Sequence, residues 1–282
     1  SSGGQAGDQL SISYIIEDQD LATSGWNYLS ATSYVTLSFW FKSSINQTFY
    51  VVLESKDGTS RQYSFAITPT GADTWTKVTH TIPGNSGLQF SNDEGEGIEI
   101  YFLLFYGTNQ TTSDHTLNTW KTTDGADQAP DMTATWFETD NALFDITGVQ
   151  LEVGNVATNF EHRSFADQLY ACQRYYDKSY NHGSAPGTAE MAGAVVHSLA
   201  VSNHNYAGFP IEFNRSMRTT PTMTLYSTNN GNTGKSSADS SDGAAQVAYT
   251  GLNRTFQFRG NDSSGTGKNV FLRVHYTADA EL

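Results

Sequence analysis

The chain of 282 residues is short of cysteine and of long apolar runs, and each shortage excludes a class of protein. The single cysteine, Cys172, allows no disulfide bond within the chain, so a disulfide-stapled scaffold is excluded. No stretch of the sequence approaches the ~18 consecutive apolar residues of a membrane helix, and we expect no membrane insertion. The chain begins without methionine or a signal peptide, so we expect it to be processed or to be a piece of something longer.

Basic residues are also scarce, and the deficit is confined to one half of the sequence. Lys and Arg number 15 against 29 Asp and Glu, a net charge of −14. Residues 1–163 hold 20 acidic and 6 basic residues, whereas residues 164–282 hold 9 of each. An acidic first half repels phosphate, so we expect no nucleic-acid partner. The simplest interpretation of the acidity is a solubilising surface.

Aromatic residues, by contrast, are plentiful at 13%, while charged residues make up only 16% of the chain. Strands and tight turns favour such a composition over helices. Alternating runs separated by Gly, Pro and Asn turns predict eight strands, near residues 10–16, 34–41, 48–54, 62–68, 76–82, 98–105, 133–138 and 143–153. This spacing predicts a jelly-roll β-sandwich over residues 10–163.

One helix is expected to follow, over residues 164–180, and to connect two β modules. Ser164 and Asp167 form a capping box. The apolar stripe that follows contains Phe165, Leu169, Cys172 and Tyr176 at helical spacing, so Cys172 is interpreted as a packing residue. From residue 184 to residue 282 the strand pattern returns, and we expect a second β-sandwich that includes a long polar loop at residues 227–243. The predicted fold class is therefore all-β.

Catalytic and metal-binding motifs are missing from this sequence. No nucleophile elbow or zinc-protease motif occurs, and the seven histidines are scattered, so we expect neither an enzyme nor a zinc site. Carboxylates cluster at residues 93–96 and at Asp140 and Asp145. Two interpretations stay open for these clusters: a solvated acidic turn, which we favour, and a Ca²⁺ site. Any acidic chain offers carboxylate pairs, and nothing singles out one pair for glycoside hydrolysis.

Aromatic residues on polar strand faces are the candidate ligand-binding residues. In residues 34–41, Val35, Leu37, Phe39 and Phe41 alternate with polar positions, and Trp40 falls on the polar side. Tyr101 does the same in its own strand. With Arg61 nearby and Trp120 on a loop rim, Trp40 and Tyr101 suit stacking against a sugar. The alternative is a second apolar layer that covers both sheet faces.

Several of these segments resemble the carbohydrate-binding-module-like jelly rolls of tailed-bacteriophage virion proteins. Residues 36–43 (TLSFWFKS) resemble one of their strands, and residues 74–82, centred on Thr-Trp-Thr-Lys, fit the strand after it. Residues 146–154 (ITGVQLEVG) and 157–164 resemble their closing strand and exit, and residues 168–176 resemble the helix that follows. The ending, residues 276–282, is similar to the C-termini of many such proteins.

The resemblance implies a non-enzymatic tail-fibre, tail-tip or capsid-fibre protein on the virion surface. It implies other virion proteins and a host-surface glycan or receptor as partners, and a homotrimeric assembly, which we assign to residues 184–282. It supplies no catalytic residues. Two alternatives remain: a structural capsid or tail decoration without ligand, and, less favoured, a polysaccharide depolymerase.

Overall fold

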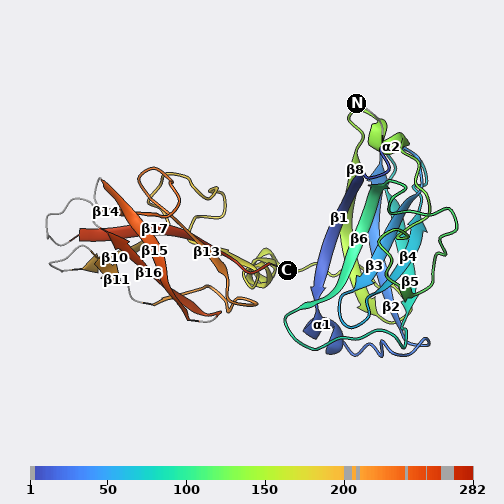
Figure 1. The fold of residues 1–282 in the computed structure, drawn as a ribbon, viewed down its shortest axis with the longest axis horizontal. Helices are drawn as coiled ribbons and strands as arrows, with labels where there is room; N and C mark the ends of the chain where they lie inside the picture. The colour runs from blue at the N-terminus through green and yellow to red at the C-terminus, as the bar shows by residue number, and fades with distance from the viewer. Residues whose placement is uncertain are drawn as a thin grey trace. The chain divides into compact units, whose positions relative to one another are not determined.

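The computed structural model describes residues 4–199, 205–207, 210–238, 241–251, 253–261 and 270–281 (Figure 1). The chain divides into two compact units, Ser1–His162 and Arg163–Glu281. The described residues form a mostly β protein with three antiparallel sheets and a few short helices. Among them, no helix is both long and apolar enough to cross a membrane.

The first unit contains two of the three sheets (Figure 1). A five-stranded sheet has the order β1-β6-β3-β4-β7, and its strands are β1 (Gln9–Glu17), β6 (Glu96–Tyr106), β3 (Phe49–Ser55), β4 (Arg61–Ile67) and β7 (Lys121–Thr122). A three-stranded sheet has the order β5-β2-β8, formed by β5 (Thr76–Pro83), β2 (Tyr34–Ser43) and β8 (Phe144–Val153). Seven of the eight predicted strands are therefore present.

These two sheets pack face to face through aromatic side chains. The rings of Phe39 on β2 and Phe102 on β6 meet edge to face, with centroids 5.1 Å apart. Phe65 on β4 stacks on His80 of β5 at 3.9 Å. Both contacts join one sheet to the other, so the main hydrophobic core lies between the sheets.

Strand β2 has the predicted side-chain alternation. Val35, Leu37, Phe39 and Phe41 are buried in the core, at 3% exposure or less. The outward positions divide along the strand: Ser38 is buried, whereas Trp40 is 42% exposed. The outer face of this sheet is therefore covered at one end and open at the other.

A long connection covers the outer face of the five-stranded sheet. Residues 107–134 hydrogen-bond to β4 through the Asn118 amide, which donates to the Ser64 carbonyl at 2.8 Å. A second, small core lies beneath this connection and consists of Val52, Leu103, Tyr106 and Ala129. Tyr101 packs against that core. The prediction that a second apolar layer covers a sheet face therefore holds for this sheet.

The predicted strand at residues 133–138 is wrong, because Thr135–Glu138 forms the short helix α2. Its Trp136 is buried, donating its backbone amide to Oε1 of Gln47 at 2.8 Å and its indole N–H to the Leu143 carbonyl at 3.1 Å. These tertiary contacts outweigh the strand preference of the local sequence. A second short helix, α1 (Asp18–Ala22), follows β1.

The predicted helix over residues 164–180 is present but much shorter, because α3 spans only Phe165–Cys172. Ser164 caps it as expected, accepting a hydrogen bond from the Asp167 amide at 3.2 Å. No residue of α3 is buried and Cys172 is exposed, so its assignment as a packing residue is wrong. Residues 176–178 instead form β9 (Tyr176–Lys178), which pairs with β17 (Val270–Asp279). Pairing with a distant strand ends the helical pattern early.

The second unit contains one nine-stranded sheet. Strand β17 pairs with several of the other strands. Its residues 270–274 pair with β10 (Val195–Leu199), and its residues 275–279 pair with β13 (Thr222–Tyr226). The remaining strands are β11 (Asn205–Ala207), β12 (Ile211–Glu212), β14 (Lys235–Ala238), β15 (Ser241–Gly251) and β16 (Thr255–Asn261). The predicted polar loop at residues 227–243 is interrupted by β14, which pairs with β15.

Candidate ligand-binding face

The structure does not bring the four predicted binding residues together. Trp40 lies on the outer face of the three-stranded sheet, opposite in direction to the core residue Phe39. Tyr101 lies on β6 of the other sheet and alternates with the core residue Phe102. Because the two sheets pack through Phe39 and Phe102, Trp40 and Tyr101 face away from each other on opposite outer surfaces.

Tyr101 is occupied by contacts within its own sheet. Its hydroxyl donates to the Glu99 carboxylate and accepts from Nζ of Lys56 at 3.1 Å. The Lys56 ammonium also lies 5.4 Å from the ring centroid. Burial raises the pKa of Tyr101, and the hydrogen bond to Glu99 raises it further, so the phenol stays neutral. These contacts make Tyr101 a member of a polar cluster on its sheet.

Trp120 and Arg61 do not form the predicted open rim. Trp120 is buried, its ring packs 5.4 Å from that of Tyr63, and its indole N–H donates to the Pro83 carbonyl at 2.7 Å. Placing Trp120 on a loop rim was therefore wrong, since this loop tryptophan fills the core. Arg61 is half-buried, and its guanidinium lies against Gly87, where an added Cβ would come within 2.6 Å of it.

Trp40 has a partner on its own face that the sequence analysis missed, namely Trp75. Trp40 pairs with Lys77 across β2 and β5, and Phe41 pairs with Thr76. Trp75 therefore precedes the strand on the same side as Lys77 and Trp40. Nζ of Lys42 lies 5.3 Å from the Trp75 centroid, which fixes that ring over the outer face. Trp40 and Trp75 are 42% and 44% exposed.

A third aromatic ring joins this face from the chain that leaves β8. The backbone amide of Glu161 donates to Oε1 of Gln150 at 2.8 Å, so residues 158–161 fold back across the outer face of β8. Gly148, at φ +62°, lies where the register of β2 and β8 shifts, which marks a β-bulge. A Cβ on Gly148 would lie 3.7 Å from Trp40 and 3.8 Å from Phe160. The two rings therefore flank a position without a side chain.

We define the aromatic face as Trp40, Trp75 and Phe160 with Lys77. Each ring is between 42% and 44% exposed, and Lys77 is exposed beside Trp40. At its edge Lys42 forms an ion pair with Asp145 at 3.0 Å. Exposed aromatic rings gathered on one sheet face are typical of binding surfaces, since single apolar residues are otherwise scattered. The alternation of Trp75, Lys77 and Thr79 is the signal that could have revealed Trp75.

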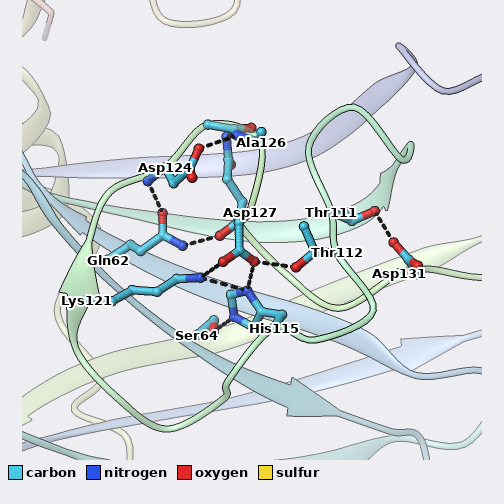
Figure 2. A network of polar contacts seen from close by, with 12 residues as sticks. Gln62, Ser64, Thr111, Thr112, His115, Lys121, Asp124, Ala126, Asp127 and Asp131 are labelled. Atoms are coloured by element: carbon cyan, nitrogen blue, oxygen red, sulfur yellow. Dashed lines mark hydrogen bonds and ion pairs between the residues drawn. The ribbon is translucent and has the colours of Figure 1, made fainter.

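A second polar network links the 107–134 connection to β4 (Figure 2). The Ser64 hydroxyl lies 2.5 Å from Nε2 of His115, and Nδ1 of His115 lies 2.6 Å from Oδ1 of Asp127. Lys121 contacts the other Asp127 oxygen, and Thr112 donates to Oδ1 at 2.8 Å. The contacts run from serine to histidine to aspartate, as they do in the catalytic triad of a hydrolase.

Ser64 and His115 are nevertheless too deeply buried to contact a substrate. Ser64 is 2% exposed and the His115 side chain 0%. Burial alone would raise the pKa of Asp127, but hydrogen bonds from Lys121, His115 and Thr112 lower it to about 2. The ionised Asp127 thus holds His115 against Ser64 of β4. We call this network, which fixes the connection to the sheet, the clasp.

The acidic clusters have partners other than a metal ion. Oδ1 of Asp93 accepts from the Gly95 amide at 2.7 Å, and Asp145 pairs with Lys42. Within the described ranges, no three His, Cys, Asp or Glu side chains gather closely enough to hold a metal ion. These contacts fit the acidic-turn interpretation of residues 93–96 and give no support to a Ca²⁺ site.

Comparison with known proteins adds little. No family model matches the chain, and no curated protein matches it. Among solved structures, the crystal structure of PBSX exported protein XepA is weakly similar, with 8% sequence identity and a TM-score of 0.21 over 98% of this chain and 84% of that one. A score this low carries no argument about fold or function.

Proposed function

We propose that the protein is a non-enzymatic bacteriophage virion protein of the tail-fibre or tail-tip type, and that its first unit, a jelly roll, binds host-surface glycan through the aromatic face. The carrying observation is the pair of exposed tryptophans, Trp40 and Trp75, on one side of one sheet. The apolar C–H face of a pyranose ring can bury against such rings, and burial of apolar area is the main source of affinity. The resemblance of residues 36–43 and 146–164 to phage virion modules supports the same proposal.

A glycan array, probed with the whole protein, tests this function. We expect binding to one or more glycans that the double variant W40A/W75A loses. The variant F165A is a matched control, because Phe165 is 71% exposed but belongs to the second unit. The proposal fails if the array shows no binding, or if the double variant binds as the wild type does.

Assembly into a homotrimer, and with other virion proteins, belongs to the same proposal. Val196 on β10 and Phe271 on β17 are 49% and 50% exposed. Val196 pairs with Arg273, and Phe271 pairs with Ser198, so both apolar side chains lie on the same face of the two strands. Light scattering on the whole chain is expected to give three times 30.8 kDa, and less for F271D. A wild-type monomer would contradict trimer formation.

A purely structural decoration is the second candidate, favoured by a different surface. Leu10, Ile12 and Tyr14 on β1 are 40%, 41% and 64% exposed. Ile12 and Tyr14 pair with the core residues Phe102 and Ile100, so they extend the core-facing side of the sheet beyond its cover. Contact with another virion protein would bury this row. An image of the particle with the first unit buried between neighbours, and no face open to solvent, would favour this candidate over glycan attachment.

A further inference from the structure

A pocket of about 330 Å³ opens in the first unit, away from the residues of the aromatic face. Its walls are residues 45–48, between β2 and β3, and residues 131–135, which lead into α2; Tyr50 of β3 also lines it. We infer that this pocket is a second binding site, which takes one uncharged sugar ring. Its lining shares no residue with Trp40, Trp75 or Phe160.

The two walls are held together before any ligand arrives. Gln47 accepts the Trp136 amide at 2.8 Å through Oε1, and its Nε2 donates to the Thr133 carbonyl at 3.5 Å. Trp136 is itself buried in the core, which anchors the second wall. A site fixed in this way avoids the entropic cost of ordering loops when ligand binds.

Two polar groups of the lining retain hydrogen-bonding capacity. Oδ1 of Asp131 accepts from Thr111 at 2.9 Å, and within the described residues Asp131 forms no other hydrogen bond. The Tyr50 hydroxyl forms none within that same part of the chain. Burial, and secondarily the charge of Asp131, raises the pKa of Tyr50, so the phenol stays protonated beside the carboxylate. A carboxylate acceptor and a phenol that both donates and accepts can together hold vicinal hydroxyl groups.

The charge and polarity of the lining indicate which class of ligand the pocket can bind. Asp131 is the one charged side chain of the lining, Ile45 and Met132 are apolar, and the others are amides and threonines. Anions are disfavoured twice, by Asp131 and by the net charge of −14 on residues 1–163.

Size narrows the ligand further. Pockets for drug-sized ligands start at about 300 Å³. At about 330 Å³ this pocket lies near the lower end of that range, which fits a single sugar ring. A neutral pyranose meets both demands, because it offers C–H groups to Ile45 and Met132 and hydroxyl groups to Asp131 and Tyr50.

Saturation-transfer NMR on the whole protein tests the inference, with the methyl glycosides of glucose, galactose and mannose, N-acetylglucosamine and glucuronate as probes. We expect at least one neutral probe to bind, and glucuronate to bind more weakly. D131N preserves the shape of the side chain and an oxygen for Thr111, and Y50F removes only the hydroxyl. Each variant should weaken the neutral probe about tenfold or more, since a hydrogen bond to a charged group is lost or weakened.

W40A is the matched control, because it damages the aromatic face and leaves the pocket intact. Amide shifts induced by the probe in residues 45–50 and 131–135 would locate the site even if a variant folds poorly. The inference is overturned if no neutral probe binds, if D131N and Y50F bind as the wild type does, or if W40A abolishes the signal. It is equally overturned if glucuronate binds best. Loss of array binding in W40A/W75A with retained pocket binding separates this site from the proposed attachment function.

Discussion

Trp75 lies two residues before Lys77, the residue that pairs with Trp40, so both indole rings leave the same face of the β5-β2-β8 sheet. Diagonal neighbours of this kind lie about 7–8 Å apart, which is close enough for long side chains to act together. Neither tryptophan has the partner that a core position would provide, and both remain more than two-fifths exposed. The relationship makes this sheet face, not the four predicted residues together, the candidate glycan surface.

Single substitutions should separate the two tryptophans of the aromatic face from Tyr101. W40A and W75A are each expected to weaken glycan binding about tenfold or more, as buried tryptophans of an interface typically do. Y101F should leave binding unchanged, because Tyr101 lies on the opposite outer face and contacts Glu99 and Lys56. Titration of a glycan identified on the array measures all three. Equal losses in all three variants would contradict the assignment.

Trp75 and Trp120 should differ sharply in their effect on stability. W120A is expected to lower the free energy of unfolding by about 3–5 kcal/mol, because it empties a buried site and removes the bond to the Pro83 carbonyl. W75A should change it by no more than about 0.5 kcal/mol, as exposed positions do. Urea denaturation followed by circular dichroism compares the two. A stable W120A protein would show that Trp120 is not a core residue.

Acid should loosen the clasp around Asp127. Its pKa is about 2 in the folded protein and near the ordinary 3.8 when unfolded, so its ionised form stabilises the fold above pH 4. That contribution is lost as the pH falls from about 4 to about 2. D127N should therefore be less stable than the wild type at pH 6, and the difference should shrink over that range. D114N, an exposed acidic residue of the same connection, serves as the control.

Asp18 should have the opposite pH dependence. Burial, reinforced by the neighbouring Asp57, raises its pKa from 3.8 to about 6. The folded state therefore binds the proton more tightly, and the stabilisation present below pH 4 is lost as the pH rises through 6. D18N, which keeps an oxygen for the Asn92 amide, should gain stability over the wild type at pH 7 and not at pH 4. Unfolding curves at the two pH values measure the difference in stability between D18N and the wild type. At pH 7 this difference would have the opposite sign if Asp18 were stably ionised in the folded protein.

Cys172 should react as a surface thiol. Because the side chain is exposed on α3, a water-soluble disulfide reagent is expected to modify one thiol per chain in the native protein, at a rate close to that of the urea-unfolded chain. A native rate that is slower by orders of magnitude would restore the packing role that the helical stripe first suggested.

Sequence periodicity identified the strands and helix starts that are determined by residues close together in the chain. The alternation of Val35, Leu37, Phe39 and Phe41 located β2 and its buried side, and the Ser164 cap located the start of α3. What the sequence could not supply depends on distant partners. Strand β17 ends the helix by pairing with residues 176–178, and Gln47 draws residues 135–138 into a helix.

Of the aromatic face, Trp40 was predicted, whereas Trp75 and Phe160 were missed for the same reason. Trp40 and Trp120 look alike in sequence, one on a strand and one in a loop, and only the three-dimensional packing separates a surface ring from a core ring. Trp75 becomes the neighbour of Trp40 through the register of β2 against β5, a pairing that links residues 35 positions apart. Register is set by the burial of whole faces and is not encoded near either tryptophan.

The return of the chain across β8 gives Phe160 two roles at once. It is one ring of the aromatic face, and it stands two residues before His162, where the first unit ends. Residues 158–161 are held by side chains of β8, through Gln150 and Glu152. A ligand that immobilises Phe160 would therefore also stiffen residues 158–162, the segment that leads into the second unit.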